Sequence, residues 1–264
     1  MSSKRPFAKL SFAIAFSVML GAGCLPRQIK PVDSIDPAPL LSLVRERQSA
    51  FGRGLSGTME LAFKNRKKRF NSKVYIVAYP DGRFRMEIPG AFGNTYLFMV
   101  NDNREIMAFY PGDNRAFSSA VNSRSLNRHL PFPLPVDPEK IAALIMGVLP
   151  HQNGQDLGVQ AYLMKSGEKL LETETSDSDL RYAYLFGKTP QSRLRKITIR
   201  GKDVEVSIVT DLKAPNLPRN FEILFPEGFI KGQWEKVSLF EGNDSVLELQ
   251  IPGSTTVTDL DKIP

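Results

Sequence analysis

The sequence has few of the residues on which enzymes usually depend. Its 264 residues include one cysteine, Cys24, which excludes an internal disulfide. The two histidines, His129 and His151, lack the spacing to cysteines or carboxylates that is typical of a metal site. No serine lies in the strand–turn–helix setting of a nucleophile elbow. We therefore expect no catalytic residue, no metal and no cofactor, and a protein that is not an enzyme.

Long apolar runs are also scarce, and the one near the N-terminus is short. Residues 1–9 carry three positive charges, residues 10–20 are uncharged and mostly apolar, and small residues follow as far as Gly23. This layout predicts a secretory signal peptide over residues 1–23. The apolar run is too short to cross a bilayer as a helix, which takes about 20 residues.

The excess of positive charge is too small to indicate a nucleic-acid-binding protein. The chain has 35 lysines and arginines against 28 aspartates and glutamates, a net charge of +7. Lys4, Arg5 and Lys9 belong to the expected signal peptide, and without them the balance is 32 against 28, or +4. Because the remaining excess is mild and dispersed, we expect no nucleic-acid partner.

The position of Cys24 resembles the lipobox of bacterial lipoproteins, whose cysteine is lipidated and becomes the new N-terminus. Gly21 departs from that pattern, which usually has leucine or a similar residue there. Acyl chains, at about 0.8 kcal/mol per buried CH₂, would hold the protein on a membrane almost permanently. Under the sorting rule of such lipoproteins, Leu25 in place of aspartate implies the periplasmic face of the outer membrane of a Gram-negative bacterium. The alternative is a plain secretory signal followed by a chance cysteine.

Proline and charged residues over 24–39 predict an extended tether, and 253–264 is expected to be a polar tail. Between them, periodicity predicts two helices and about eleven short strands, mostly joined by hairpins. The expected helices are 40–50 and 137–147, and the strands lie at 57–63, 70–79, 83–88, 96–100, 105–110, 155–164, 180–186, 194–200, 204–210, 221–225, 234–241 and 245–251.

These elements predict a mainly β (α+β) domain over residues 40–252. Its strands would form a single antiparallel sheet that curls on itself and so has an inward, concave face. Side chains, helices or a ligand must fill that face. The residues that we assign to an apolar cavity there are Met59, Leu61, Phe63, Phe84, Met86, Ile88, Phe98, Ile141, Leu144 and Ile145. Ordinary core packing explains the same pattern.

An unusual loop joins two of the expected strands. It consists of Pro89, Gly90, Ala91, Phe92 and Gly93 and carries a bare phenylalanine among small residues, whereas loop tips are normally polar. The phenylalanine either tucks back as a plug or protrudes to touch something apolar.

Three segments, in this order, resemble the LolA/LolB lipoprotein-carrier family: GAFGNT at 90–95, LPFPLPVDPEKIAALIMGVLP at 130–150, and the closing series RLRKITI, PRNFEILFP and KVSLF. The likeness extends from about residue 40 to 240 and is nearest to the outer-membrane-anchored LolB receptors. It implies an open, incomplete β-barrel that is lined with apolar residues, has helices covering its concave face, and receives acylated lipoproteins from a periplasmic carrier protein. It also implies that Phe92, where that family usually has leucine, belongs to a membrane-insertion loop. The segment after residue 245 departs from the family by extending past its usual end.

Other motifs carry little chemistry. The G-x-G-x-x-G match at 52–57 follows a helix and opens a strand, the reverse of a dinucleotide site. The acidic cluster of Glu172, Glu174, Asp177 and Asp179 lacks the register of a calcium loop and favours a solvated hairpin tip. The basic turn 64–69 is either a solvated loop or a contact for anionic head groups.

Two functions are compatible with these features. The first is a LolB-like receptor that binds the acyl chains of lipoproteins, with no covalent chemistry. The second is a non-transferring envelope lipoprotein of the same fold, an adaptor or sensor that binds a lipid or a protein partner. In either case we expect a monomer held at the membrane by its lipid anchor.

Overall fold

The computed structural model describes residues 31–52, 54–90, 93–121, 123, 125–132, 138–148, 158–174, 180–189, 193–211, 213–214, 217–240 and 243–262. The expected signal peptide, Cys24 and Leu25 lie outside these residues, as do Ala91 and Phe92 of the loop. His151, Asp177 and Asp179 also lie outside them.

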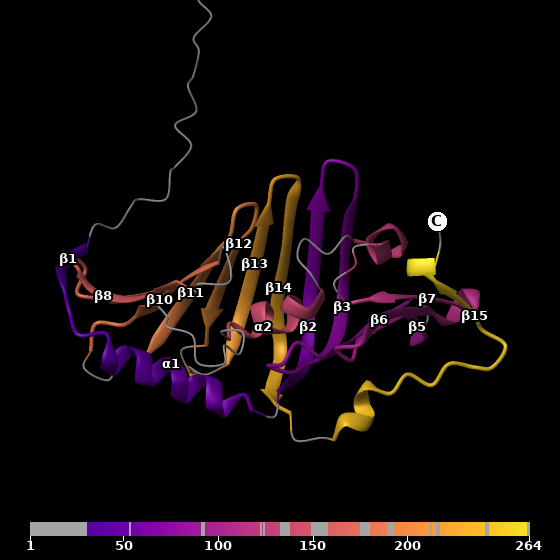
Figure 1. Cartoon of the computed structure of the whole chain (residues 1–264), viewed down its shortest axis with the longest axis horizontal. Coiled ribbons are helices and arrows are strands. Elements are labelled where there is room, and N and C mark those ends of the chain that lie inside the picture. Colours follow the sequence, from indigo (N-terminus) through magenta and orange to yellow (C-terminus); the bar gives the residue numbers. More distant parts are fainter. Residues whose placement is uncertain are drawn as a thin grey trace, which may run out of the picture. The chain divides into compact units, whose positions relative to one another are not determined.

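The described residues form one large sheet of fifteen strands (Figure 1). Its order is β1-β8-β9-β10-β11-β12-β13-β14-β2-β3-β4-β5-β6-β7-β15, and β1 and β15 are its two ends, so the sheet is not closed. All neighbours are antiparallel except β7 and β15, which are parallel. The strands are β1 (Pro31–Ser34), β2 (Leu55–Asn65), β3 (Arg69–Ala78), β4 (Phe84–Pro89), β5 (Thr95–Asn101), β6 (Glu105–Tyr110), β7 (Arg115–Ala120), β8 (Gly158–Met164), β9 (Lys169–Glu174), β10 (Arg181–Phe186), β11 (Leu194–Arg200), β12 (Glu205–Thr210), β13 (Pro218–Phe225), β14 (Gly228–Leu239) and β15 (Thr256–Asp259).

The long strands β2 and β14 join the two halves of the sheet. They pair from Asn65 with Gly228 down to Leu55 with Leu239, interrupted by one irregularity between Trp234 and Lys236. At this irregularity the backbones come so close that a Cβ on Gly57 would lie 2.0 Å from the Lys236 carbonyl oxygen. A glycine is therefore required at position 57, because a side chain would push the two strands apart.

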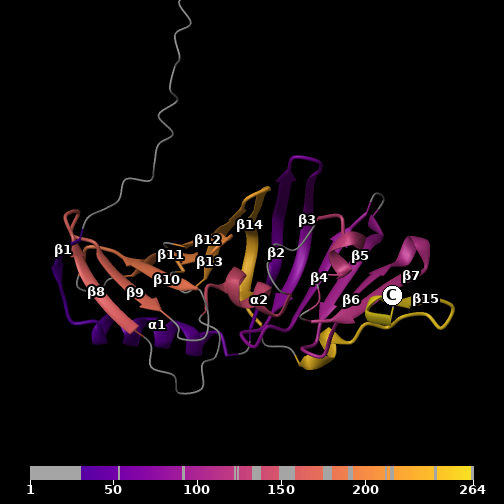
Figure 2. The same ribbon diagram turned by 45° about the horizontal axis from the view of Figure 1, so that its top comes forward.

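Two helices are present in the described residues: α1 (Ala38–Ala50) and α2 (Pro138–Met146). The Asp36 carboxylate accepts a hydrogen bond from the Ala38 amide at the start of α1, at 3.0 Å. Helix α2 contacts β3 and β13, and in Figure 2 it lies beside β14 and β2. Its described side chains from Ile141 to Met146 are all buried, as a helix that is apolar on every side requires.

Helix α2 ends at Gly147, whose φ is +65°. The amides of Gly147 and Val148 donate to the carbonyls of Leu144 and Ala143, which closes the last turn. A Cβ on Gly147 would lie 2.6 Å from Cδ1 of Ile197 in β11. Glycine thus permits both the left-handed backbone and the close approach of the helix to the sheet.

The structure confirms a mainly β, open sheet with two helices, and corrects several local expectations. Four strands were not expected: β1 within the tether, β7, β9 in the acidic cluster, and β15 within the polar tail. The expected strand 245–251 is instead a 3₁₀ turn, η4 (Asp244–Leu247), followed by irregular chain. Of these four, β1 and β15 are the two edge strands, which need only backbone pairing with one neighbour and so lack the alternation from which strands are predicted.

Candidate functional site

One face of the sheet carries most of the residues that we predicted to form an apolar cavity. The register pairs Met86 with Ile76 of β3 and with Met99 of β5, which places these side chains on the same face. Nine of the ten predicted residues are buried in the core that includes this face and α2: Met59, Leu61, Phe63, Phe84, Met86, Ile88, Ile141, Leu144 and Ile145.

The tenth residue, Phe98, lies on the opposite face of the sheet. It pairs with Glu87, the Arg85 guanidinium lies 5.1 Å from the centre of its ring, and it stacks on Phe109. Strand β5 buries side chains on both faces, so alternation could not assign Phe98 to a side. The pairing with β4 places the Phe98 side chain on the same face as Glu87, opposite Met86 and Met99.

The apolar face is filled by side chains rather than open to solvent. Phe132, which follows η3 (Ser125–His129), packs on Phe63 and Phe70 with ring centres 6.2 and 5.3 Å apart. Helix α2 packs against β3 and β13, and its described side chains are buried in the same core. Among the described residues, an apolar ligand would have to displace α2 or the 130–132 segment to contact the side chains that they bury.

Arg47 of α1 holds the C-terminal end of α2. Its Nη1 donates to the Gly147 carbonyl at 2.7 Å and its Nη2 to the Met146 carbonyl at 2.6 Å. A cation at a helix C-terminus also stabilises the helix dipole. The guanidinium lies 4.5 Å above the Phe51 ring, and the whole residue is only 3% exposed. This contact joins two helices that are about a hundred residues apart in sequence.

Burial perturbs the acid–base chemistry around Arg47. Loss of solvation lowers the pKa of Arg47 to about 10, so the side chain is still charged at neutral pH. Burial likewise raises the pKa of the neighbouring Tyr184 hydroxyl, which keeps it protonated. The Nε of Arg47 and the Tyr184 hydroxyl have no hydrogen-bond partner within the described part of the chain. The Arg47 clamp, by which we mean its two hydrogen bonds to the end of α2, therefore buries a guanidinium whose hydrogen-bond donors are only partly satisfied.

Residue spacing alone indicates that Arg47 faces the core, because Leu40 and Val44 lie seven and three residues before it, the spacing of one helix face. An arginine on an apolar stripe is a signal for a buried partner, although its identity needs the tertiary structure.

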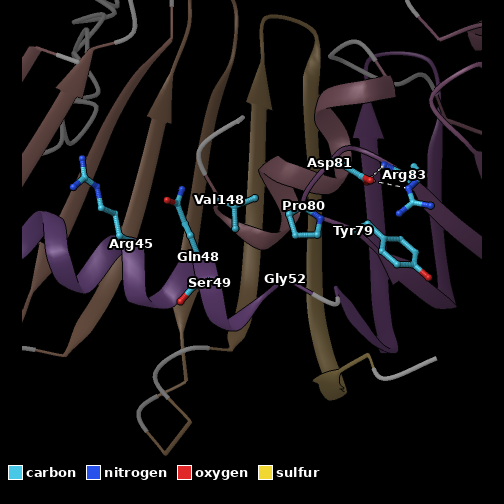
Figure 3. Close-up of a pocket in the computed structure, with 9 residues that line it drawn as sticks. All are labelled: Arg45, Gln48, Ser49, Gly52, Tyr79, Pro80, Asp81, Arg83 and Val148. Carbon is cyan, nitrogen blue, oxygen red and sulfur yellow. Dashed lines mark hydrogen bonds and ion pairs between the residues drawn. The ribbon is translucent and has the colours of Figure 1, made fainter. Parts of the chain in front are cut away.

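A cavity of about 470 Å³ lies beside the clamp (Figure 3). Such a volume is within the range of small-molecule sites. One of its walls is the C-terminal half of α1, and another is the turn between β3 and β4, where Arg83 pairs with Asp81 at 2.7 Å. It is lined by Arg45, Gln48, Ser49, Gly52, Tyr79, Pro80, Asp81, Arg83 and Val148. None of the predicted cavity residues lines it, and its mixed polar lining suits an amphipathic group better than a bare acyl chain.

The predicted loop is described only at its base. The Gly90 amide donates to the Asn94 carbonyl at 2.7 Å, and Gly93 has a φ of +81°. Pro89 and Gly93 are exposed. The position of Phe92 stays a prediction.

The remaining candidates show no site chemistry. Glu174 lies in β9 and pairs with Arg181 at 3.2 Å across the hairpin, while His129 stacks on Phe117 at 4.2 Å. The described residues contain no group of side chains that could hold a metal. No helix in the described ranges is both long and apolar enough to span a bilayer.

Comparison with known proteins gives distant structural likenesses only. No protein-family model and no curated protein matches the chain. A LolA superfamily protein from Nitrosomonas europaea aligns over 79% of this chain and 97% of its own, at 10% identity and a TM-score of 0.47. A domain described as an outer membrane lipoprotein-sorting protein, from Vibrio parahaemolyticus, aligns over 78% of this chain and 97% of its own, at 11% identity and a TM-score of 0.47. A DUF1329 family protein from Desulfovibrio piger aligns over 81% of this chain and 98% of its own, at 12% identity and a TM-score of 0.37. Likenesses this distant do not assign the chain to a family.

Proposed function

We propose that this protein is an outer-membrane-anchored lipoprotein that binds the acyl chains of other lipoproteins and helps to insert them into the membrane, as a LolB-like receptor. The observation that carries the proposal is the broad apolar face of an open sheet, against which one short helix packs with its C-terminal end held by a single arginine. The lipobox-like Cys24 and the three sequence segments that resemble the LolA/LolB family support it.

The mechanism needs binding energy but no enzyme chemistry. Helices α1 and α2 would cover the concave face in the resting protein, and α2 would move aside when acyl chains enter. The acyl chains would exchange one apolar surface for another without exposure to water, so the free-energy change of the transfer would be small. Contact of the 89–93 loop with the bilayer would then let the chains leave for the membrane.

Lipidation is the first testable part of the proposal. Cells that make the protein should incorporate radiolabelled palmitate into it, and Cys24→Ser should remove the label because the chain has no other thiol. A variant that keeps the label would overturn the anchor.

The receptor function is tested by depleting the protein in its native host and following where lipoproteins accumulate. Acylated lipoproteins should build up on the carrier or in the inner membrane. Restoring the wild-type gene should return them to the outer membrane. Unchanged localisation, with no second copy of the gene, would contradict receptor function.

The filled core favours a second candidate, an envelope adaptor or sensor that does not transfer cargo. Such a protein would keep α2 in place and use its outer surface to bind a partner. Its depletion would leave lipoprotein localisation unchanged, and the purified protein would not take up acylated peptide. The genes beside it offer a further discriminator, because an envelope-complex operon favours the adaptor and genes for a lipoprotein carrier favour the receptor.

A further inference from the structure

The hairpin between β2 and β3 holds five basic side chains in a fixed turn. The Asn65 side-chain oxygen accepts hydrogen bonds from the amides of Lys67 and Lys68, at 2.9 and 2.6 Å. The Asn65 amide in turn donates to the Lys68 carbonyl at 2.9 Å. This Asx turn organises the tip without using any basic side chain. The tip is therefore a rigid support for exposed charge.

The basic side chains of this tip form no ion pair with a described residue. The five are Lys64, Arg66, Lys67, Lys68 and Arg69, and all of them are exposed. Cations elsewhere on the sheet, in contrast, pair with carboxylates of other strands. The β2–β3 hairpin also extends beyond its neighbours in both views (Figure 1, Figure 2). Adjacent like charges repel one another, so this arrangement costs stability unless something anionic binds there.

A second group of cations surrounds an aromatic pocket that includes Lys68. The pocket has a volume of about 350 Å³. It is lined by Lys68, Tyr96, Tyr110, Asp113, Arg115, Phe117, Arg128, His129, Leu130 and Pro131. Its floor is fixed, because the Tyr110 hydroxyl donates to the His129 carbonyl and the His129 ring stacks on Phe117. Asp113 is the one carboxylate in this lining, against Lys68, Arg115 and Arg128.

The 64–69 tip and the aromatic pocket lie along the same edge of the sheet as the 89–93 loop, the edge that the ends of the strands form. Because strands β2 to β7 alternate in direction, the β2–β3, β4–β5 and β6–β7 turns all fall at one edge. The carboxylate of Glu227, in the adjacent β13–β14 turn, is outnumbered there. Tyr96, which is 47% exposed, adds an aromatic ring of the kind that favours the membrane interface.

We propose that this edge docks on a bilayer containing anionic phospholipids, with the 64–69 tip lying along the headgroups and one lipid phosphate bound between Lys68, Arg115 and Arg128. The inference rests on the proposed function, in which the 89–93 loop must meet the membrane. Arginine and lysine donors at the mouth and tyrosine below them match a phosphate with its glycerol and upper acyl carbons. Docking would hold the loop against the bilayer while cargo leaves.

The test compares vesicles of phosphatidylcholine with vesicles of equimolar phosphatidylcholine and phosphatidylglycerol. The full-length chain with Cys24→Ser is used, so that acylation does not anchor it. The segment 1–20, with its apolar run and three positive charges, is the same in every variant, so the readout is how the ratio of the two affinities changes between variants. We expect a strong preference for the anionic vesicles that high salt removes, since screening shortens the reach of charge to a few ångströms.

The variant Arg66→Gln, Lys67→Gln, Lys68→Gln should lose that preference by roughly 100-fold, because each basic residue near an anionic surface contributes about fivefold. The matched control removes three exposed lysines from turns at the opposite edge: Lys165→Gln, Lys188→Gln and Lys213→Gln. It has the same net charge and should keep the preference. Neither triple should lower the melting temperature, because the hydrogen bonds of Asn65 are untouched and the tip variant only relieves repulsion between like charges.

Binding of wild type to both kinds of vesicle with equal affinity would overturn the proposal, as would an equal loss in the control triple. The pair Arg115→Gln, Arg128→Gln tests the pocket separately, and an unchanged preference there would overturn the phosphate site. No lipoprotein cargo takes part in these measurements. Failure here therefore differs from failure of the receptor function, which is scored by lipoprotein localisation.

Discussion

Replacing Arg47 by methionine should lower the free energy of unfolding by about 3 kcal/mol and loosen α2 from the sheet. Methionine keeps much of the packing over Phe51, but it cannot donate to the carbonyls of Met146 and Gly147. A buried carbonyl that loses its donor costs about 1–3 kcal/mol. The lost stability should concentrate at α2, since these two hydrogen bonds are made to its C-terminal end.

Two measurements check this expectation. Denaturant unfolding gives the change in stability, and the fluorescence of an apolar dye reports exposure of the core face, which should rise in Arg47→Met under native conditions. Arg45→Met is the matched control, because Arg45 is an exposed arginine two residues away on the same helix. Equal stability and equal dye binding in Arg47→Met and wild type would show that the cost of burying the charge cancels the clamp.

Replacing Phe92 by glutamate should abolish transfer of lipoprotein cargo into liposomes while leaving its uptake from the carrier intact. In the proposed function the loop enters the membrane interface, and a carboxylate there costs a few kcal/mol. The substitution should not affect folding if Phe92 protrudes, because an exposed side chain contributes little to the core. The apolar face that accepts the cargo is unchanged in this variant.

A tucked Phe92 predicts the opposite pattern. Its loss would remove about 3–5 kcal/mol of stability and lower the melting temperature by several degrees. The control is Leu239→Glu, which places the same charge on an exposed leucine, 44% exposed, at the other edge of the sheet. A stable Phe92→Glu protein with full transfer activity would contradict both positions of the side chain.

Strong local patterns in this chain were sufficient to predict much of its secondary structure. The β4 strand was visible because Phe84, Met86 and Ile88 alternate with polar residues on a sheet with one buried face. Helix α2 was visible because Pro138 and Gly147 mark its ends and its interior is apolar. The single, mainly antiparallel sheet followed from the number of hairpin-connected strands, and its openness was expected from the resemblance to the LolA/LolB family.

The edge strands were beyond sequence reasoning because tertiary contacts create them. Strand β15 pairs in parallel with β7, and Asn114 next to β7 bonds to Ser254 and Thr255 just before β15. Those contacts join residues about 140 positions apart. A polar segment with no alternation gives no local sign that such a partner exists.

For the candidate site, composition and periodicity alone determined that the chain has a broad apolar face, and they named nine residues that the structure buries in one core. Only the tertiary structure decided that α2 packs against β3 and β13, that Phe98 lies on the other side of the sheet, and that Arg47 holds α2 from another helix. The physical reason is that burial follows from a residue's own chemistry and its near neighbours. The strand pairings and the partner of a buried charge depend on segments that folding alone brings together.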